Sequence, residues 1–169
     1  MSLEGIFING VFSTVINEIL DVQEHVPEQV LYLQPYAGDK IAELYKNPPS
    51  VDHPVRLFLS LTDDLPTVRY ICEIVGWDDK RELVGRKREI IEAVIKTFQP
   101  DEQEVYAERH GVECVNLIHV RRMKHLSQPF SVAELIKLSD GQTVSTNRTR
   151  AGGWVYVKYP NMSWLESYF

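Results

Sequence analysis

Residues 55–75 read VRLFLSLTDDLPTVRYICEIV and contain two apolar segments separated by a short polar link. Every second residue is apolar in residues 55–61 and again in residues 68–75. Such alternation is typical of β-strands that bury one face. The link, residues 62–66 (TDDLP), is short and turn-like. The two segments are therefore predicted to pair as an antiparallel hairpin.

Apolar spacing and turn residues predict further elements on both sides of this hairpin. Before it we predict a helix over residues 12–24 that ends near Pro27, a short buried strand over 30–33, and a short helix over 41–45 that Asn47-Pro48-Pro49 ends. After it we predict a helix over 81–98 with Asp78 or Asp79 as N-cap, a loop or short helix over 101–110, a strand over 115–120, a helix over 132–138 with a capping box at 131–134, and a strand over 154–159. This order predicts an α+β fold, because strands and helices do not alternate strictly.

Length and composition indicate one globular domain spanning residues 1–169. The chain has 169 residues, of which 44% are hydrophobic and 25% are charged. These fractions are typical of globular proteins, and they exclude intrinsic disorder, collagen-like repeats and coiled coil. No apolar run approaches the roughly 20 residues needed to cross a bilayer, and the first residues do not resemble a secretory signal. With two cysteines far apart, Cys72 and Cys114, we expect reduced thiols in a cytoplasmic protein with no membrane contact.

The net charge of −6 is distributed unevenly along the sequence. Residues 1–55 hold eight acidic and two basic side chains, whereas residues 121–158 hold seven basic and two acidic ones. The protein is therefore acidic at one end and basic near the other. The basic part is compatible with a nucleic-acid partner, and the acidic first third is compatible with a basic protein partner.

Basic and aromatic residues suit nucleic acid together, because cations neutralise phosphates while rings stack on unpaired bases. The candidate binding residues are Lys40, Lys46, Trp77, Arg121, Arg122, Lys124, Arg148, Arg150 and Trp154. The alternative for the charges is a solvated rim, and for the tryptophans it is packing in the core.

Signatures of other chemistry are absent from the sequence. It contains no glycine-rich phosphate loop, no H-E-x-x-H and no G-x-S-x-G. A zinc site would draw on His110, Glu113, Cys114 and His119, but their irregular spacing does not match the close ligand pairs of structural sites. We therefore expect neither a metal nor another cofactor.

Residues 34–49, QPYAGDKIAELYKNPP, carry a family resemblance. They resemble the G-x-K-x-x-E signature of ASCH domains, and Gly38, Lys40, Glu43, Lys46 and Pro48 fall in matching places. The hairpin ending at Val75-Gly76-Trp77 and the later segments 129–135 and 150–154 resemble the rest of ASCH, EVE and other PUA-like domains. The resemblance implies a PUA-like, partly closed mixed β-barrel with surrounding helices. Its core would span residues 30–159, with the helix 12–24 packed on it.

The same resemblance implies two functions. One is a nucleic-acid-binding module that recognises RNA, DNA or a modified base, with Trp77 lining a base pocket inside a basic rim. The alternative is a small ASCH-type hydrolase acting on a modified nucleoside, amidohydrolase- or nuclease-like, in which Lys40 and Glu43 cooperate. Ile41 stands where the family often has threonine, and Tyr45 where it commonly has arginine. A second alignment makes Lys40 and Glu43 an exposed i,i+3 pair without a catalytic role.

Overall fold

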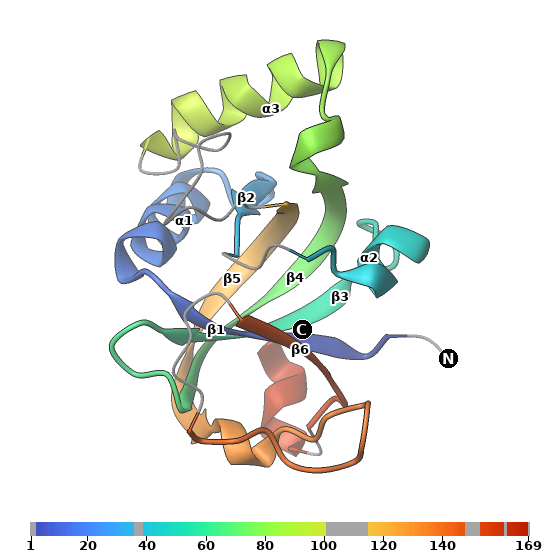
Figure 1. Cartoon of the computed structure of the whole chain (residues 1–169). Helices are drawn as coiled ribbons and strands as arrows, with labels where there is room; N and C mark the ends of the chain where they lie inside the picture. Colours follow the sequence, from blue (N-terminus) through green and yellow to red (C-terminus); the bar gives the residue numbers. More distant parts are fainter. Residues whose placement is uncertain (1–2, 36–38, 101–114, 148–152, 161, 169) are drawn as a thin grey trace.

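The computed structural model describes residues 3–35, 39–100, 115–147, 153–160 and 162–168 (Figure 1). Its strands are β1 (Gly5–Val11), β2 (Leu31–Leu33), β3 (Val55–Leu61), β4 (Thr67–Asp79), β5 (Asn116–Ser131) and β6 (Gly153–Val157). Its α-helices are α1 (Ser13–His25), α2 (Ala42–Lys46) and α3 (Gly85–Phe98), and its 3-10 helices are η1 (Lys80–Glu82), η3 (Val132–Glu134) and η4 (Ser163–Tyr168). The fold is of the α+β class, as predicted.

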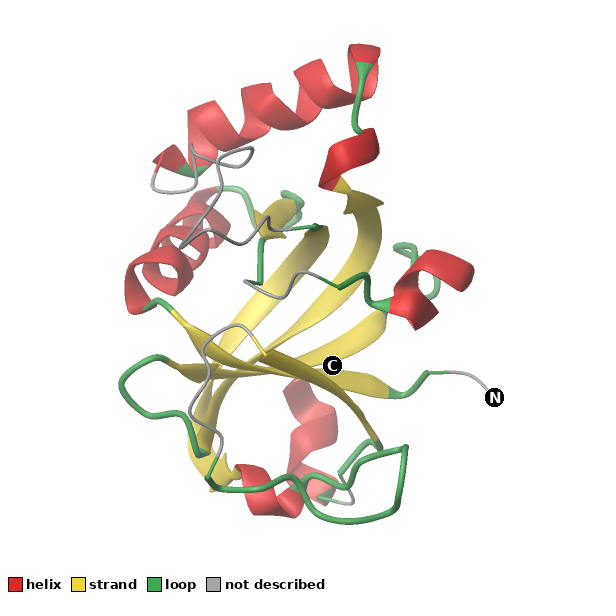
Figure 2. Cartoon of the chain, viewed as in Figure 1, coloured by secondary structure: helices red, strands yellow, loops and turns green. Residues whose placement is uncertain are grey.

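The described strands form one mixed sheet in the order β2-β5-β4-β3-β1-β6. β1 runs parallel to β3, and the other neighbouring strands are antiparallel. The sheet curves strongly, with α1 beside its hollow and α3 beyond one end (Figures 1 and 2). β2 and β6 are its two edges, so this sheet is open.

The hairpin predicted from residues 55–75 is confirmed. Val55 pairs with Ile74 and Leu57 pairs with Cys72 in an antiparallel register. β4 continues beyond the predicted end to Asp79, because β5 pairs with it as far as Asp79 and Asn116. The predicted helix over residues 12–24 and the strand over residues 30–33 are also present, as α1 and β2.

Strand β1 was not predicted, although it lies in the interior of the sheet between β3 and β6. Ile6, Phe7 and Ile8 are consecutive and all are buried. A strand covered on both faces has no polar alternation and reads as a short apolar run. The sheet therefore begins at Gly5, whereas the family resemblance implied a core that starts near Val30.

The prediction of one helix over residues 81–98 is wrong at its start. Asp79 accepts a hydrogen bond from the backbone of Arg81 at 2.9 Å and caps the short η1 instead. α3 begins only at Gly85, whose φ of +62° lies in the left-handed region that favours glycine. The chain changes direction at this residue, so the two helical segments are separate.

Strand β5 runs well past its predicted end, and the predicted helix over residues 132–138 is wrong. β5 pairs with β4 down to Ser131, and Arg122 has a φ of +54° within a break in the strand register. Only η3 follows, because the backbone N–H of Leu138 donates to the Tyr156 carbonyl of β6, and the Ile136 carbonyl accepts from the N–H of Lys158, just after β6. The predicted loop or helix over residues 101–110 lies outside the described residues.

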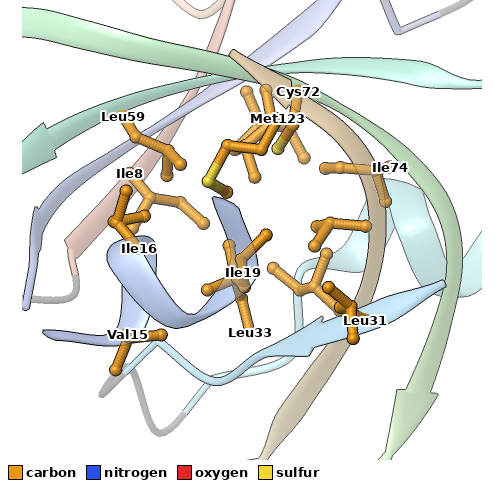
Figure 3. Close-up of a cluster of buried hydrophobic side chains, with 14 of the residues drawn as sticks. Ile8, Val15, Ile16, Ile19, Leu31, Leu33, Leu59, Cys72, Ile74 and Met123 are labelled. Carbon is orange, nitrogen blue, oxygen red and sulfur yellow. The ribbon is translucent and has the colours of Figure 1, made fainter. Parts of the chain in front are cut away.

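The largest core cluster fills the hollow of the curved sheet. Figure 3 shows Ile8, Ile16, Leu33 and Leu59 directed toward a common centre from β1, α1, β2 and β3. A second cluster lies on the opposite face of the sheet, beneath η3 and η4.

Cys72 is fully buried, and burial raises the pKa of its thiol far above the ordinary value. Its predicted burial is confirmed, whereas Cys114 lies outside the described residues.

Two glutamine side chains complete the backbone hydrogen bonding at the edges of β5 and β2. Gln23 both donates to and accepts from the backbone of Met123, each at 2.7 Å. Gln99 does the same with the backbone of Tyr32, each at 2.8 Å. A primary amide presents the same donor and acceptor as a peptide, so these side chains occupy the place of a neighbouring strand.

In the described part of the chain, no helix has the length and apolar character needed to cross a membrane.

Candidate functional site

Contacts divide the predicted nucleic-acid residues into three groups. Lys40, Lys46 and Trp77 belong to the region of α2 and the end of β4; Arg121, Arg122 and Lys124 lie on β5; Trp154 lies on β6. Arg148 and Arg150 lie outside the described residues. Within the first group, Trp77 lines a pocket that also contains the exposed ring of Tyr45, and Lys40 lies beside that ring.

That pocket, called the α2–β4 pocket below, has a volume of about 500 Å³. It is lined by Tyr45, Pro48, Trp77, Asp78, Asp79, Glu82, Leu83, Val84 and Lys87. The rings of Tyr45 and Trp77 meet edge to face with centroids 5.9 Å apart. The Tyr45 side chain is 54% exposed, and the Lys40 ammonium lies 4.3 Å from its ring centroid. The pocket therefore joins aromatic walls, carboxylates and a lysine.

Asn116 holds the two sides of this pocket together. Its side-chain oxygen accepts from Trp77 Nε1 and from the backbone of Ile41, both at 2.9 Å. Its amide nitrogen donates to the backbone oxygen of Asp39 at 2.8 Å. Asn116 is fully buried at the start of β5. Sequence reasoning missed it, and the only signal was a polar residue in a predicted apolar strand.

Asp79 anchors the charged side of the pocket. Its carboxylate accepts from Arg81 Nε at 3.0 Å and from Arg81 Nη2 at 2.8 Å, and Lys40 Nζ lies 3.3 Å away. Hydrogen bonds from Arg81 lower the pKa of Asp79 to about 2, with a smaller contribution from Lys40. Asp79 therefore stays ionised in all but strongly acidic solution.

Asp78, the neighbouring carboxylate, joins β5 to α3. It contacts His119 Nε2 at 2.8 Å and Lys87 Nζ at 2.5 Å. Burial acts to raise the pKa of Asp78, but the hydrogen bonds from His119 and Lys87 outweigh it and the pKa is lowered. A Cβ on Gly76 would lie 2.5 Å from His119 Nδ1, so only glycine leaves room for this histidine.

The shifted pKa of Asp79 predicts an acid-dependent loss of stability. Its ionised form stabilises the fold above the unfolded-state pKa of about 4, and this contribution is lost as the pH falls through the folded-state value of about 2. Urea unfolding should show a wild-type advantage over Asp79→Asn of about 1–2 kcal/mol at pH 6 that shrinks steadily between about pH 4 and pH 2. Asp63→Asn, in the exposed turn after β3, is the control. A constant difference across this range would contradict the assignment.

Lys40 and Glu43, the alternative catalytic pair, face different pockets. Lys40 pairs with Asp79 beside the α2–β4 pocket. Glu43 lies 3.9 Å from Lys46 and lines a separate cavity of about 700 Å³ that also contains Asp52 and His53. No geometry on the described residues supports direct cooperation between Lys40 and Glu43.

The basic cluster on β5 is paired within the protein. Arg121 is 9% exposed, and its Nε donates to Glu73 at 2.9 Å. Arg122 lies 3.4 Å from Glu28 and 3.7 Å from Glu73. Lys124 Nζ donates to the backbone oxygen of Tyr168 at 2.8 Å. A phosphate would have to displace these partners, which reduces the cluster's value as a binding rim.

Trp154 packs against Tyr156 with ring centroids 5.0 Å apart, and both rings border the main core. Of the four residues considered as zinc ligands, only His119 is described, and it pairs with Asp78. Among described residues, no group of three histidine, cysteine, aspartate or glutamate side chains is arranged to hold a metal ion.

Comparison with known proteins gives no match to a family model, a curated protein or a solved structure.

Proposed function

We propose that this chain is a nucleic-acid-binding module that accepts one unpaired base in the α2–β4 pocket. The observation that carries the proposal is the pair of rings, Tyr45 and Trp77, which lines a pocket of about 500 Å³. Unpaired bases stack on such rings, and each stacked base contributes about 1–3 kcal/mol to binding. Lys40 positions the Tyr45 ring by lying over its face at 4.3 Å.

Two exposed lysines on the elements that form the pocket are candidates for phosphate contacts: Lys87, which lines the pocket, and Lys46, which follows Tyr45 on α2. The side chains of Lys46 and Lys87 are 66% and 61% exposed. Lys46 lies 3.9 Å from its carboxylate partner, Glu43. Exposed ion pairs contribute only about 0–1 kcal/mol, so a phosphate can compete for such lysines. Lys46 is therefore the phosphate contact that we propose, whereas Lys87 would first have to leave Asp78, to which it donates at 2.5 Å, and Lys40 is paired with Asp79.

The PUA-like, partly closed barrel is part of the same proposal. Its support is the strong curvature of the mixed sheet around a filled hollow and the hydrogen bond of 3.1 Å from the Glu43 backbone to the Tyr156 hydroxyl. This bond links α2 to β6, an edge strand of the sheet. The site lies near that link, at the outer end of β4. RNA and DNA are both candidate ligands at this stage.

The proposal predicts that removing the exposed ring weakens binding of single-stranded oligonucleotides. Tyr45→Ala should raise the dissociation constant at least about tenfold, because a stacking surface is lost, whereas Tyr45→Phe keeps the ring and should bind like wild type. Fluorescence anisotropy with labelled RNA and DNA of mixed sequence, at several salt concentrations, measures both. Circular dichroism confirms that each variant is folded. Wild-type protein that binds neither polymer at low ionic strength would refute the proposal, as would unchanged binding by Tyr45→Ala.

A further inference from the structure

The carboxylates of the α2–β4 pocket differ in whether their oxygens already accept hydrogen bonds from other residues of the protein. Both oxygens of Asp79 are engaged by Arg81, and Lys40 approaches as well. Both oxygens of Asp78 are engaged, by Lys87 and His119. These two groups are therefore committed to holding the pocket together.

Glu82 is the carboxylate that retains hydrogen-bonding capacity. Its side chain is 70% exposed, and its ion pair with Lys40 is long, at 3.8 Å. That separation exceeds hydrogen-bonding distance, so Lys40 attracts the carboxylate without occupying its lone pairs. Glu82 lines the same pocket as Tyr45 and Trp77. An ionised carboxylate only accepts hydrogen bonds, and its two oxygens suit a pair of parallel donors.

Among the four common bases, guanine presents such a pair. Its N1–H and N2–H groups are adjacent donors on the Watson–Crick edge. The corresponding edges of adenine, cytosine and uracil or thymine place an acceptor beside each donor, and that acceptor would face a carboxylate oxygen. Of the four common bases stacked on the pocket's rings, only guanine can thus donate two parallel hydrogen bonds to the Glu82 carboxylate.

We infer that the α2–β4 pocket selects guanine, and that Glu82 is the residue that determines this specificity by accepting from N1–H and N2–H. This inference rests on the proposed function. It adds a base preference that the stacking rings alone do not provide, because every base has a face that can stack.

Matched ligands and matched variants test the inference. Four short oligonucleotides differ at one central position, which carries guanine, hypoxanthine, adenine or cytosine in an otherwise uniform pyrimidine strand. Hypoxanthine is guanine without the 2-amino group. Wild type should bind the guanine strand about tenfold more tightly than the hypoxanthine strand. Glu82→Gln should abolish this difference, because its amide nitrogen is a donor that faces another donor.

Glu89→Gln is the control variant, since Glu89 is equally exposed at 69% and has a similarly long ion pair of 3.7 Å, with Arg86. It should keep the wild-type preference. Equal affinity for the guanine and hypoxanthine strands would overturn the inference, as would a preference that survives in Glu82→Gln. If Tyr45→Ala still weakens binding in either case, the proposed pocket stands and only its guanine selection is wrong. If no strand binds at all, both proposals fail.

Discussion

Replacing Arg121 with alanine is expected to lower the free energy of unfolding by about 3 kcal/mol, because a buried carboxylate loses its closest partner and keeps only the longer ion pair with Arg122, at 3.7 Å. Glu73 is 6% exposed and accepts from Arg121 Nε at 2.9 Å. Arg121 also approaches the backbone oxygen of Val51 at 3.3 Å, so the variant additionally loses a link to the segment before β3. Urea unfolding followed by circular dichroism measures the change.

Two variants distinguish the stability lost by breaking the Arg121–Glu73 ion pair from the stability lost by removing any positive charge on β5. Lys124→Ala removes an exposed lysine of the same strand and should cost less than about 1 kcal/mol. The double variant Arg121→Met with Glu73→Leu replaces both charges with apolar groups and should recover most of the lost stability. If Arg121→Ala is as stable as wild type, the pair does not stabilise the fold, and Arg121 again becomes available as a phosphate contact.

Asn116→Leu is expected to have a similarly large effect, about 3 kcal/mol of unfolding free energy. The substitution removes the partner of two N–H donors, on Trp77 and Ile41, and of the Asp39 carbonyl. A buried polar group left without a partner costs about 1–3 kcal/mol, and nearby water reduces the sum. Thermal and urea unfolding measure this loss.

The same variant should also weaken oligonucleotide binding under conditions where it remains folded. Trp77 would lose the bond that orients its ring, and residues 39–41, which include Lys40, would lose their attachment to β5. Asn147→Ala, on an exposed turn, serves as the control and should change neither property. Full stability in Asn116→Leu would show that these three hydrogen bonds are not needed, and full stability with full affinity would remove Asn116 from the site.

Local sequence patterns predicted the elements whose two faces differ. The alternation in residues 55–61 and 68–75 identified β3 and β4, and helical spacing identified α1 and most of α3. These patterns are visible because one set of positions in each element is apolar throughout, whereas the other set includes polar residues, even though the structure buries both faces of β3. β1 has no polar face to alternate with, and the full length of β5 depends on its pairing with β4. Neither property is encoded within a short window of sequence.

The candidate site shows the same division. The sequence identified Lys40 and Trp77 as chemically useful, and the structure joins them through Tyr45. The sequence also suggested Arg121 and Arg122 as nucleic-acid contacts because of their positive charge, although in the structure Glu73 and Glu28 lie close to them. Opposite charges 48 residues apart, as for Arg121 and Glu73, cannot be recognised as partners until the strands pair.

The sequence by itself therefore determined the α+β class, the central hairpin and the residue types available for binding. The tertiary structure alone decided the position of β1, the pairing of each charge, and the assembly of Tyr45, Trp77 and Glu82 around one pocket. The physical reason is the separation along the chain of the residues that determine each property. Periodicity reflects the burial of a single element, whereas strand order and charge pairing depend on contacts between residues far apart in the chain.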